Sequence, residues 1–179
     1  MPVVPFPVVG LGNVNDANEV FADRTGELGA YYVVRGASQQ YSIVKFIRAT
    51  DGFSEGEAAI SDYATLKDYH VARAATADAY LPICRGIAAA TIASGRCGYL
   101  YVAGYCPIIA VSHTTASGDG LVIGVSTAGA FSPNLSSSVL NATVGTGPNA
   151  TVPYHVVAYA REIIATGHVG SAQICGWWG

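Results

Sequence analysis

Residues 97–125 read CGYLYVAGYCPIIAVSHTTASGDGLVIGV, and this stretch decides the fold class. It holds three short apolar runs, at 99–102, 108–113 and 121–125, which are separated by Gly104 and by a Ser-Gly-Asp-Gly turn sequence. Short β-prone runs bounded by turn residues are typical of strands. The connections between them are too short for the crossover that parallel strands need, so we expect antiparallel neighbours.

The same pattern extends to both sides of this stretch. Further strand-like runs lie at 31–34, 41–48, 70–74, 83–92, 154–161 and 169–178. The run 41–48 is apolar on both faces, which indicates a strand between two layers. A helix within 54–77 is the weaker alternative there, because its apolar residues lack a regular helical spacing. The sequence therefore predicts a mainly β fold, with a single antiparallel β-sandwich or barrel-like domain.

Two segments fall outside this pattern. Residues 1–12 are expected to form an extended arm, because prolines alternate there with valines and a phenylalanine and exclude a helix. Residues 13–179 are expected to form the single β-rich domain. Within it, residues 126–151 are rich in Ser, Thr, Asn, Gly and Pro, which predicts a long polar loop or a pair of weak strands. Loops of this length are usually functional or are held by a partner.

Composition and charge argue against several classes of protein. Hydrophobic residues make up 51% of the chain and charged residues 12%, which excludes intrinsic disorder. The net charge is −3 and no run of Lys or Arg exists, so no nucleic-acid partner is expected. The apolar stretch 97–111 is too short and too broken to span a bilayer, and the start does not resemble a signal peptide, so no membrane is expected. A surface with so few charges is typical of one that a partner covers.

The four cysteines, Cys84, Cys97, Cys106 and Cys175, lack the close pairing that zinc sites use. No histidine has another His or a Cys close by in the sequence, so we expect no metal and no cofactor. Small buried thiols in a reducing compartment are the expected state of these cysteines.

The sequence contains no motif that predicts catalysis. Ser112, His113 and Asp119 are the residue types of a hydrolase triad, but no nucleophile turn of the G-x-S-x-G type accompanies them. Gly10-Leu11-Gly12 resembles the start of a dinucleotide-binding loop, yet the third glycine and the helix are missing. No spacing selects two of the acidic residues as a pair for glycoside hydrolysis. We therefore expect no catalytic residues and no enzyme activity.

The chain instead carries residues suited to binding another protein. The candidate interface residues are Pro2, Val3, Val4, Pro5, Phe6, Pro7 and Val8 of the arm, together with Trp177 and Trp178. Prolines hold the arm extended beforehand, which lowers the entropy lost on docking. Adjacent strand residues face opposite ways, so one Trp can enter the core while the other faces a partner. The alternative is that both Trp side chains close the core.

Residues 85–129 resemble a pattern found in head decoration, or cement, proteins of tailed bacteriophages. The matching elements are Gly86-Ile87-Ala88, Ile92-Ala93-Ser94-Gly95, Gly98-Tyr99-Leu100-Tyr101-Val102-Ala103-Gly104, the run 108–111, the turn Ser117-Gly118-Asp119 and a strand that ends near Gly129. The chain departs from the pattern at Cys97 and Cys106, where small or apolar residues would be expected.

This resemblance implies a structural protein of the virion. Cement proteins bind the outer surface of the major capsid protein shell and stabilise the head, and they are assembled in the host cytoplasm. The resemblance thus implies the major capsid protein as partner and a homo-oligomer, with a trimer favoured. The alternative is a β-rich phage tail or fibre-type binding module that recognises glycans or another structural protein.

Overall fold

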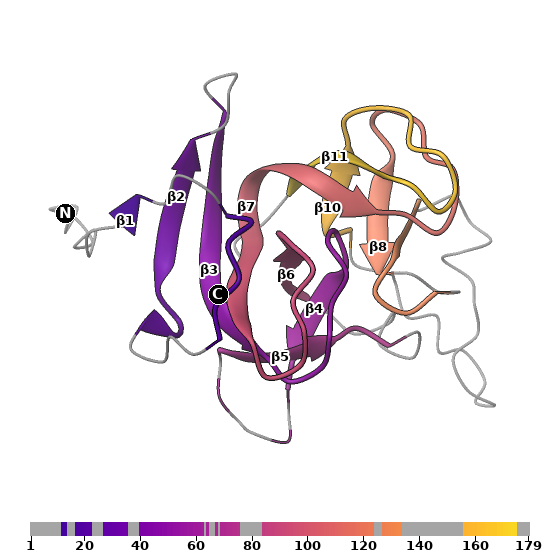
Figure 1. The fold of residues 1–179 in the computed structure, drawn as a ribbon. Helices are drawn as coiled ribbons and strands as arrows, with labels where there is room; N and C mark the ends of the chain where they lie inside the picture. The colour runs from indigo at the N-terminus through magenta and orange to yellow at the C-terminus, as the bar shows by residue number, and fades with distance from the viewer. Residues whose placement is uncertain are drawn as a thin grey trace, which may run out of the picture.

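The protein is mainly β, as predicted. The computed structural model describes residues 12–13, 17–22, 27–35, 40–62, 64, 67, 69–75, 84–123, 127–133 and 156–174. These residues contain no helix, and their eleven strands form one connected sheet (Figure 1). The strands are β1 (Gly12–Asn13), β2 (Tyr31–Arg35), β3 (Tyr41–Ala49), β4 (Ala58–Ser61), β5 (His70–Arg73), β6 (Cys84–Ala88), β7 (Cys97–Ala110), β8 (Gly120–Ile123), β9 (Phe131–Pro133), β10 (Ala158–Ala160) and β11 (Val169–Ile174).

Five strand segments close into a ring, which we call repeat 1. β3 pairs in parallel with β5, and β5–β4, β4–β6 and β6–β7 follow as antiparallel pairs. The ring closes because the first half of β7 also pairs with β3, from Cys97 opposite Arg48 to Gly104 opposite Ser42. Large side chains from β3, β5, β7 and two loops fill its interior, while β4 and β6 contribute the small Ala59 and Ala88; the large ones are Ile47, Phe53, Val71, Ile92 and Leu100. On the far side of β3, β2 and then β1 extend the sheet.

The second half of β7 begins another ring with the same strand order, which we call repeat 2. β7–β11, β11–β10, β10–β8 and β8–β9 are antiparallel pairs. In this order β7 takes the place that β3 has in repeat 1, and β11 takes the place of β7. A parallel bridge between Val111 and Phe131 stands where β3 pairs with β5 in repeat 1. The two repeats therefore share β7.

Each repeat contains two loops that hydrogen-bond to one another. The loops span residues 50–57 and 89–96 in repeat 1, and 112–119 and 161–168 in repeat 2. In repeat 1 the backbones of Phe53 and Ile92 exchange two hydrogen bonds, of 2.8 and 3.0 Å. In repeat 2 Thr115 and Ile164 do the same, with bonds of 2.9 and 3.2 Å. All four of these side chains are buried, so each loop pair closes one end of a core.

A short sequence motif accounts for the loops that precede β7 and β11. Residues 92–98 read IASGRCG and residues 164–170 read IATGHVG. A Cβ atom at Gly98 would lie 2.6 Å from Ile92 Cδ1, and one at Gly170 would lie 2.5 Å from Ile164 Cγ1. In both repeats the last glycine of the motif thus makes room for the buried isoleucine.

Gly104 allows β7 to serve both repeats. It has a φ of +83°, and a Cβ atom there would collide with the carbonyl oxygen of Tyr41. Beside it the hydroxyl of Ser42 donates a hydrogen bond to the carbonyl of Tyr105. The prediction of two separate strands at 99–102 and 108–113 is therefore wrong, because the glycine bends the strand without ending it.

Other predicted features are corrected by the pairing. The run 121–125 does not pair with the end of β7, because β11 and β10 lie between β7 and β8. Two strand pairs are parallel within the otherwise antiparallel sheet. The region 54–77, where a helix was the weaker alternative, contributes β4 and β5. Part of the polar segment 126–151 forms β9, which is fully buried, and the residues from 134 to 151 lie outside the described residues.

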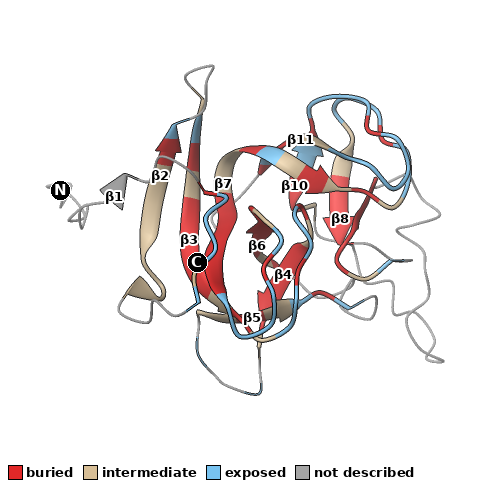
Figure 2. Cartoon of the chain, viewed as in Figure 1, coloured by how far each residue is buried: buried red, intermediate tan, exposed pale blue. Residues whose placement is uncertain are grey.

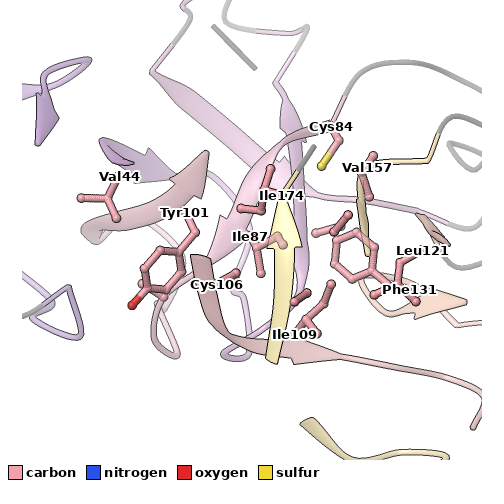
Figure 3. Close-up of a cluster of buried hydrophobic side chains, with 14 of the residues drawn as sticks. Val44, Cys84, Ile87, Tyr101, Cys106, Ile109, Leu121, Phe131, Val157 and Ile174 are labelled. Carbon is pink, nitrogen blue, oxygen red and sulfur yellow. The ribbon is translucent and has the colours of Figure 1, made fainter. Parts of the chain in front are cut away.

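The two repeats share one apolar core along their junction. Figure 3 shows Ile87 and Tyr101 of repeat 1 near Ile174, with Leu121 and Phe131 of repeat 2 beyond it. All of these side chains are nine-tenths or more buried. In the described part of the chain, no helix is long and apolar enough to cross a membrane.

Candidate interaction face

The residues predicted to contact a partner lie outside the described residues. These are Pro2, Val3, Val4, Pro5, Phe6, Pro7 and Val8, together with Trp177 and Trp178. The expected boundary between arm and domain, after residue 12, falls within β1, where Gly12 pairs with Tyr32. The described surface must therefore be searched for its own interaction face, and the two repeats offer a direct comparison.

In repeat 1 the outer face of the sheet is covered by the chain itself. The Phe21 ring lies edge-on to Phe46 and Tyr99, with ring centroids 5.7 and 6.4 Å away, and Tyr32 meets Tyr99 at 5.7 Å. Edge-to-face aromatic contacts of this kind stabilise a fold beyond the burial of their area. The segment before β2 thus covers the outer face of repeat 1.

The same segment also pairs with the sheet through its backbone. Phe21 and Cys97 exchange two backbone hydrogen bonds, each of 2.9 Å, at the edge of β7 that faces away from β3. Both groups of Cys97 are satisfied in this way, and its side chain is fully buried. We call Phe21 and its neighbours 17–22 the covering segment.

In repeat 2 the equivalent face is open. Tyr159 occupies the place of Ile87 and is 48% exposed, whereas Ile87 is 2% exposed. Val169 occupies the place of Cys97 and is also 48% exposed, and Ile163 in the neighbouring loop is 76% exposed. Figure 2 shows this contrast: β7 is buried beside β3, while β10, β11 and the loops above them carry exposed positions. We call Tyr159, Ile163 and Val169 the open face.

Polar and aromatic groups lie beside the open face. The Arg161 guanidinium stands over the Tyr105 ring, 5.3 Å from its centroid. The Glu162 carboxylate accepts hydrogen bonds from the backbone N–H and the hydroxyl of Ser171, at 2.6 and 2.8 Å. These bonds favour the charged form and lower the pKa of Glu162. Tyr and Arg next to exposed aliphatic side chains are the residue types that dominate binding energies at protein interfaces.

Ser112, the candidate nucleophile, has a structural counterpart in repeat 1. Its N–H and hydroxyl both donate to the carbonyl of Phe131, at 2.8 and 3.2 Å. Thr50, the equivalent residue, donates in the same way to the carbonyl of Val71, at 2.8 and 3.0 Å. The hydroxyl of Ser112 therefore performs a strand-closing role that is present twice in the molecule.

The other two triad candidates fit the same explanation. Asp119 accepts a hydrogen bond of 2.7 Å from the N–H of Ala116, and Glu57 accepts one of 2.8 Å from the N–H of Ser54 at the equivalent turn. His113 Nδ1 lies 3.0 Å from the Ser112 hydroxyl. Within the described residues Asp119 makes no hydrogen bond to His113, so these three side chains are not arranged as a triad.

The described cysteines are buried thiols. Burial raises the pKa of Cys84 to about 11 and that of Cys106 to about 12, which keeps both thiols protonated at neutral pH. Cys97 is also buried and free, and Cys175 lies outside the described residues. Among the residues that the structure describes, no cluster of His, Cys, Asp or Glu could hold a metal ion.

Sequence reasoning missed the open face because it did not detect the repeat. The signal was present as the pair IASGRCG and IATGHVG, which marks equivalent positions before β7 and β11. Aligning the chain on this pair places Val169 opposite Cys97 and Tyr159 opposite Ile87. The difference in exposure depends on the covering segment at Cys97 and on the shared core at Ile87, and the sequence indicates the position of neither.

Comparisons with known proteins give little further guidance. No family model matches the chain, and no curated protein matches it. Among solved structures, the chain is similar to the N-terminal base of head fiber gp8.5 of bacteriophage phi29, with 18% identity and a TM-score of 0.47 over 75% of this chain and 94% of that chain. A similarity at this level establishes neither a shared fold nor a shared role.

Proposed function

We propose that this chain is a non-enzymatic structural protein of a bacteriophage head, which decorates the outer surface of the major capsid protein shell and stabilises it. The observation that carries the proposal is the open face of repeat 2. The molecule buries Ile87 and Cys97 of repeat 1, and it leaves Tyr159 and Val169 at the equivalent places about half exposed, with Ile163 exposed in the neighbouring loop. Large apolar side chains that are exposed where their counterparts are buried mark a candidate docking surface. The resemblance of residues 85–129 to cement proteins supports the capsid shell as the partner.

The fold suits such a role. Two rings that share one strand make a rigid body, and a rigid surface loses little entropy on docking. A large apolar side chain that becomes fully buried contributes roughly 1.5–3 kcal/mol before ordering costs. Three such side chains per copy give modest binding, and a homo-oligomer, with a trimer favoured, would multiply it through avidity. Assembly in the host cytoplasm accords with the protonated, buried thiols of Cys84 and Cys106.

Co-sedimentation with capsids tests this function. Empty expanded shells of the major capsid protein encoded in the same genome are mixed with the purified chain and pelleted. We expect saturable binding to the shells, and a higher temperature of shell disruption when the chain is bound. The variant Ile163→Ser should weaken binding without changing the melting temperature of the free chain. Lack of binding by the wild-type chain would overturn the proposal.

One observation favours the glycan-binding alternative. Gly120 lies opposite Tyr159 on β8, and a Cβ atom there would lie 3.6 Å from Tyr159 Cε1, so the ring leans over the glycine. A ring packed on one side and exposed on the other could stack on a sugar. Affinity electrophoresis in gels containing dextran or polygalacturonate tests this alternative; slowed migration that Tyr159→Ala abolishes would support it.

A further inference from the structure

The edge of β11 at Val169 is the equivalent of the edge where the covering segment binds in repeat 1. Ala110 pairs with Val169, but its N–H donates to the carbonyl of Gly56 at 3.0 Å, away from β11. Val169 and Ala110 therefore form a pair without mutual hydrogen bonds, in which the N–H and C=O of Val169 point to the opposite side. In the part of the chain that the structure describes, neither group of Val169 has a hydrogen-bond partner.

Repeat 1 shows what such an edge binds. Arg48 pairs with Cys97 in the same way, and its N–H also turns away, donating to the carbonyl of Tyr69 at 2.8 Å. The N–H and C=O of Cys97 are then taken by Phe21 of the covering segment. One extended residue supplies both backbone hydrogen bonds, and its aromatic ring packs on the outer face of the sheet.

We propose that the Val169 edge of repeat 2 binds an extended segment of the capsid shell protein by strand addition, with one aromatic or large aliphatic residue in the place of Phe21. This inference rests on the proposed function and specifies its binding mode. An unpaired edge is a ready template for a strand from another chain. The incoming residue would pair with Val169 through its backbone and pack its side chain over Ile108 and Ser171, which stand in the places of Phe46 and Tyr99.

The surroundings of the edge limit the addition to a short segment. Further along β11 the N–H of Ser171 is held by the Glu162 carboxylate, and its carbonyl accepts from Arg161 at 3.0 Å. The backbone ladder thus cannot continue past Val169 toward the end of β11. Ile163 is exposed in the loop before β11.

Two variants at position 169 separate the contribution of the backbone N–H to binding from that of the side chain. Val169→Pro removes the N–H that strand addition needs, and proline is tolerated at strand edges; none of the described residues accepts a hydrogen bond from that N–H. Val169→Thr keeps the N–H and the β-branched shape. Both should melt near the wild type. In co-sedimentation with empty shells we expect roughly tenfold weaker binding for Val169→Pro, since the variant loses a hydrogen bond and leaves the acceptor on the incoming segment without a donor. Val169→Thr should bind within about twofold of the wild type.

Each other outcome has a separate meaning. If the wild type does not bind the shells, the proposed function fails. If the wild type binds and Val169→Pro binds equally well, the function stands and strand addition at Val169 is wrong. If sedimentation velocity of the chain alone shows self-association that Val169→Pro abolishes, the occupant is a second copy and the capsid segment is wrong. If Val169→Pro melts far below the wild type, hydrogen exchange at Val169 in the wild type decides: a protected N–H in the free chain overturns the inference.

Discussion

Repeat 1 and repeat 2 have the same strand order, an equivalent pair of interlocked loops and a hydroxyl-bearing residue at the ring closure, yet among the described residues only repeat 1 has a covering segment. Cys97 and Ile87 of repeat 1 are buried, while Val169 and Tyr159 at the same places in repeat 2 are about half exposed. At Cys97 the difference comes from the covering segment, which pairs with Cys97, whereas no described residue pairs with Val169 on that side. Ile87 is instead buried in the apolar core that the two repeats share. An internal duplication thus identifies a binding surface by showing the same surface when occupied.

The largest effect is expected at the strand that joins the two repeats. Gly104→Val would place a β-branched side chain at a φ of +83° and against the Tyr41 carbonyl. Strain and overpacking together should lower the free energy of unfolding by on the order of 5 kcal/mol. Urea unfolding followed by tryptophan or tyrosine fluorescence measures it.

A matched control separates conformational strain from collision. Gly118 has a φ of +91°, but a Cβ atom there would meet nothing within 4 Å. Gly118→Val should therefore cost only the strain of the backbone, about 2 kcal/mol. Equal losses for the two variants would contradict the role given to the Tyr41 contact.

The next largest effect tests whether the repeats fold as one unit. Ile92→Ala and Ile164→Ala remove equivalent buried side chains from the two loop pairs, and each should cost about 3 kcal/mol. Because both repeats share β7, we expect each variant to shift one common transition in calorimetry. Two separate transitions, of which each variant lowers only one, would show instead that the repeats unfold independently.

The sequence predicted the positions of the strands better than it predicted which strands pair. The runs at 31–34, 41–48 and 70–74 lie within one residue of β2, β3 and β5, because each is a short apolar segment that ends at a turn. Which strands pair could not be read in this way, since the loops 112–119 and 161–168 bind each other and bring β11 and β10 between β7 and β8. The open face escaped prediction for the same reason. Its exposure depends on which distant segment covers which ring, and local patterns do not record that.

A smaller effect tests the covering segment directly. Phe21→Ala should lower the free energy of unfolding by about 2 kcal/mol, less than for a fully buried ring because Phe21 is only partly buried. In the wild type the covering segment buries the Cys97 thiol. In native Phe21→Ala this thiol should therefore react faster with a thiol reagent. Mass spectrometry of the labelled protein identifies the modified cysteine.

The matched change in repeat 2 is Val169→Ala, which removes apolar area from an edge that no described segment covers. Its cost in the free chain should stay within about 0.5 kcal/mol, as for other surface substitutions. A loss comparable to that of Phe21→Ala would mean that the Val169 edge is already covered in the free chain. The comparison between an occupied and a vacant edge would then be wrong.

The smallest effect concerns an acid-sensitive contact that repeat 2 has and repeat 1 lacks. Glu162 holds Ser171 with two hydrogen bonds, whereas Ala90 occupies the equivalent place in repeat 1. These bonds lower the pKa of Glu162 in the folded protein below its ordinary value of 4.5. The stabilisation is therefore fully present above that value and is lost as the pH falls through the folded pKa. Glu162→Gln should remove this part of the pH dependence of stability, measured by urea unfolding between pH 3 and 6 (roughly the range over which the carboxyl group titrates).

Glu55→Gln, at an exposed acid of repeat 1, serves as the control. An equal change in the pH dependence of the free energy of unfolding for both variants would show that the contact with Ser171 contributes nothing specific.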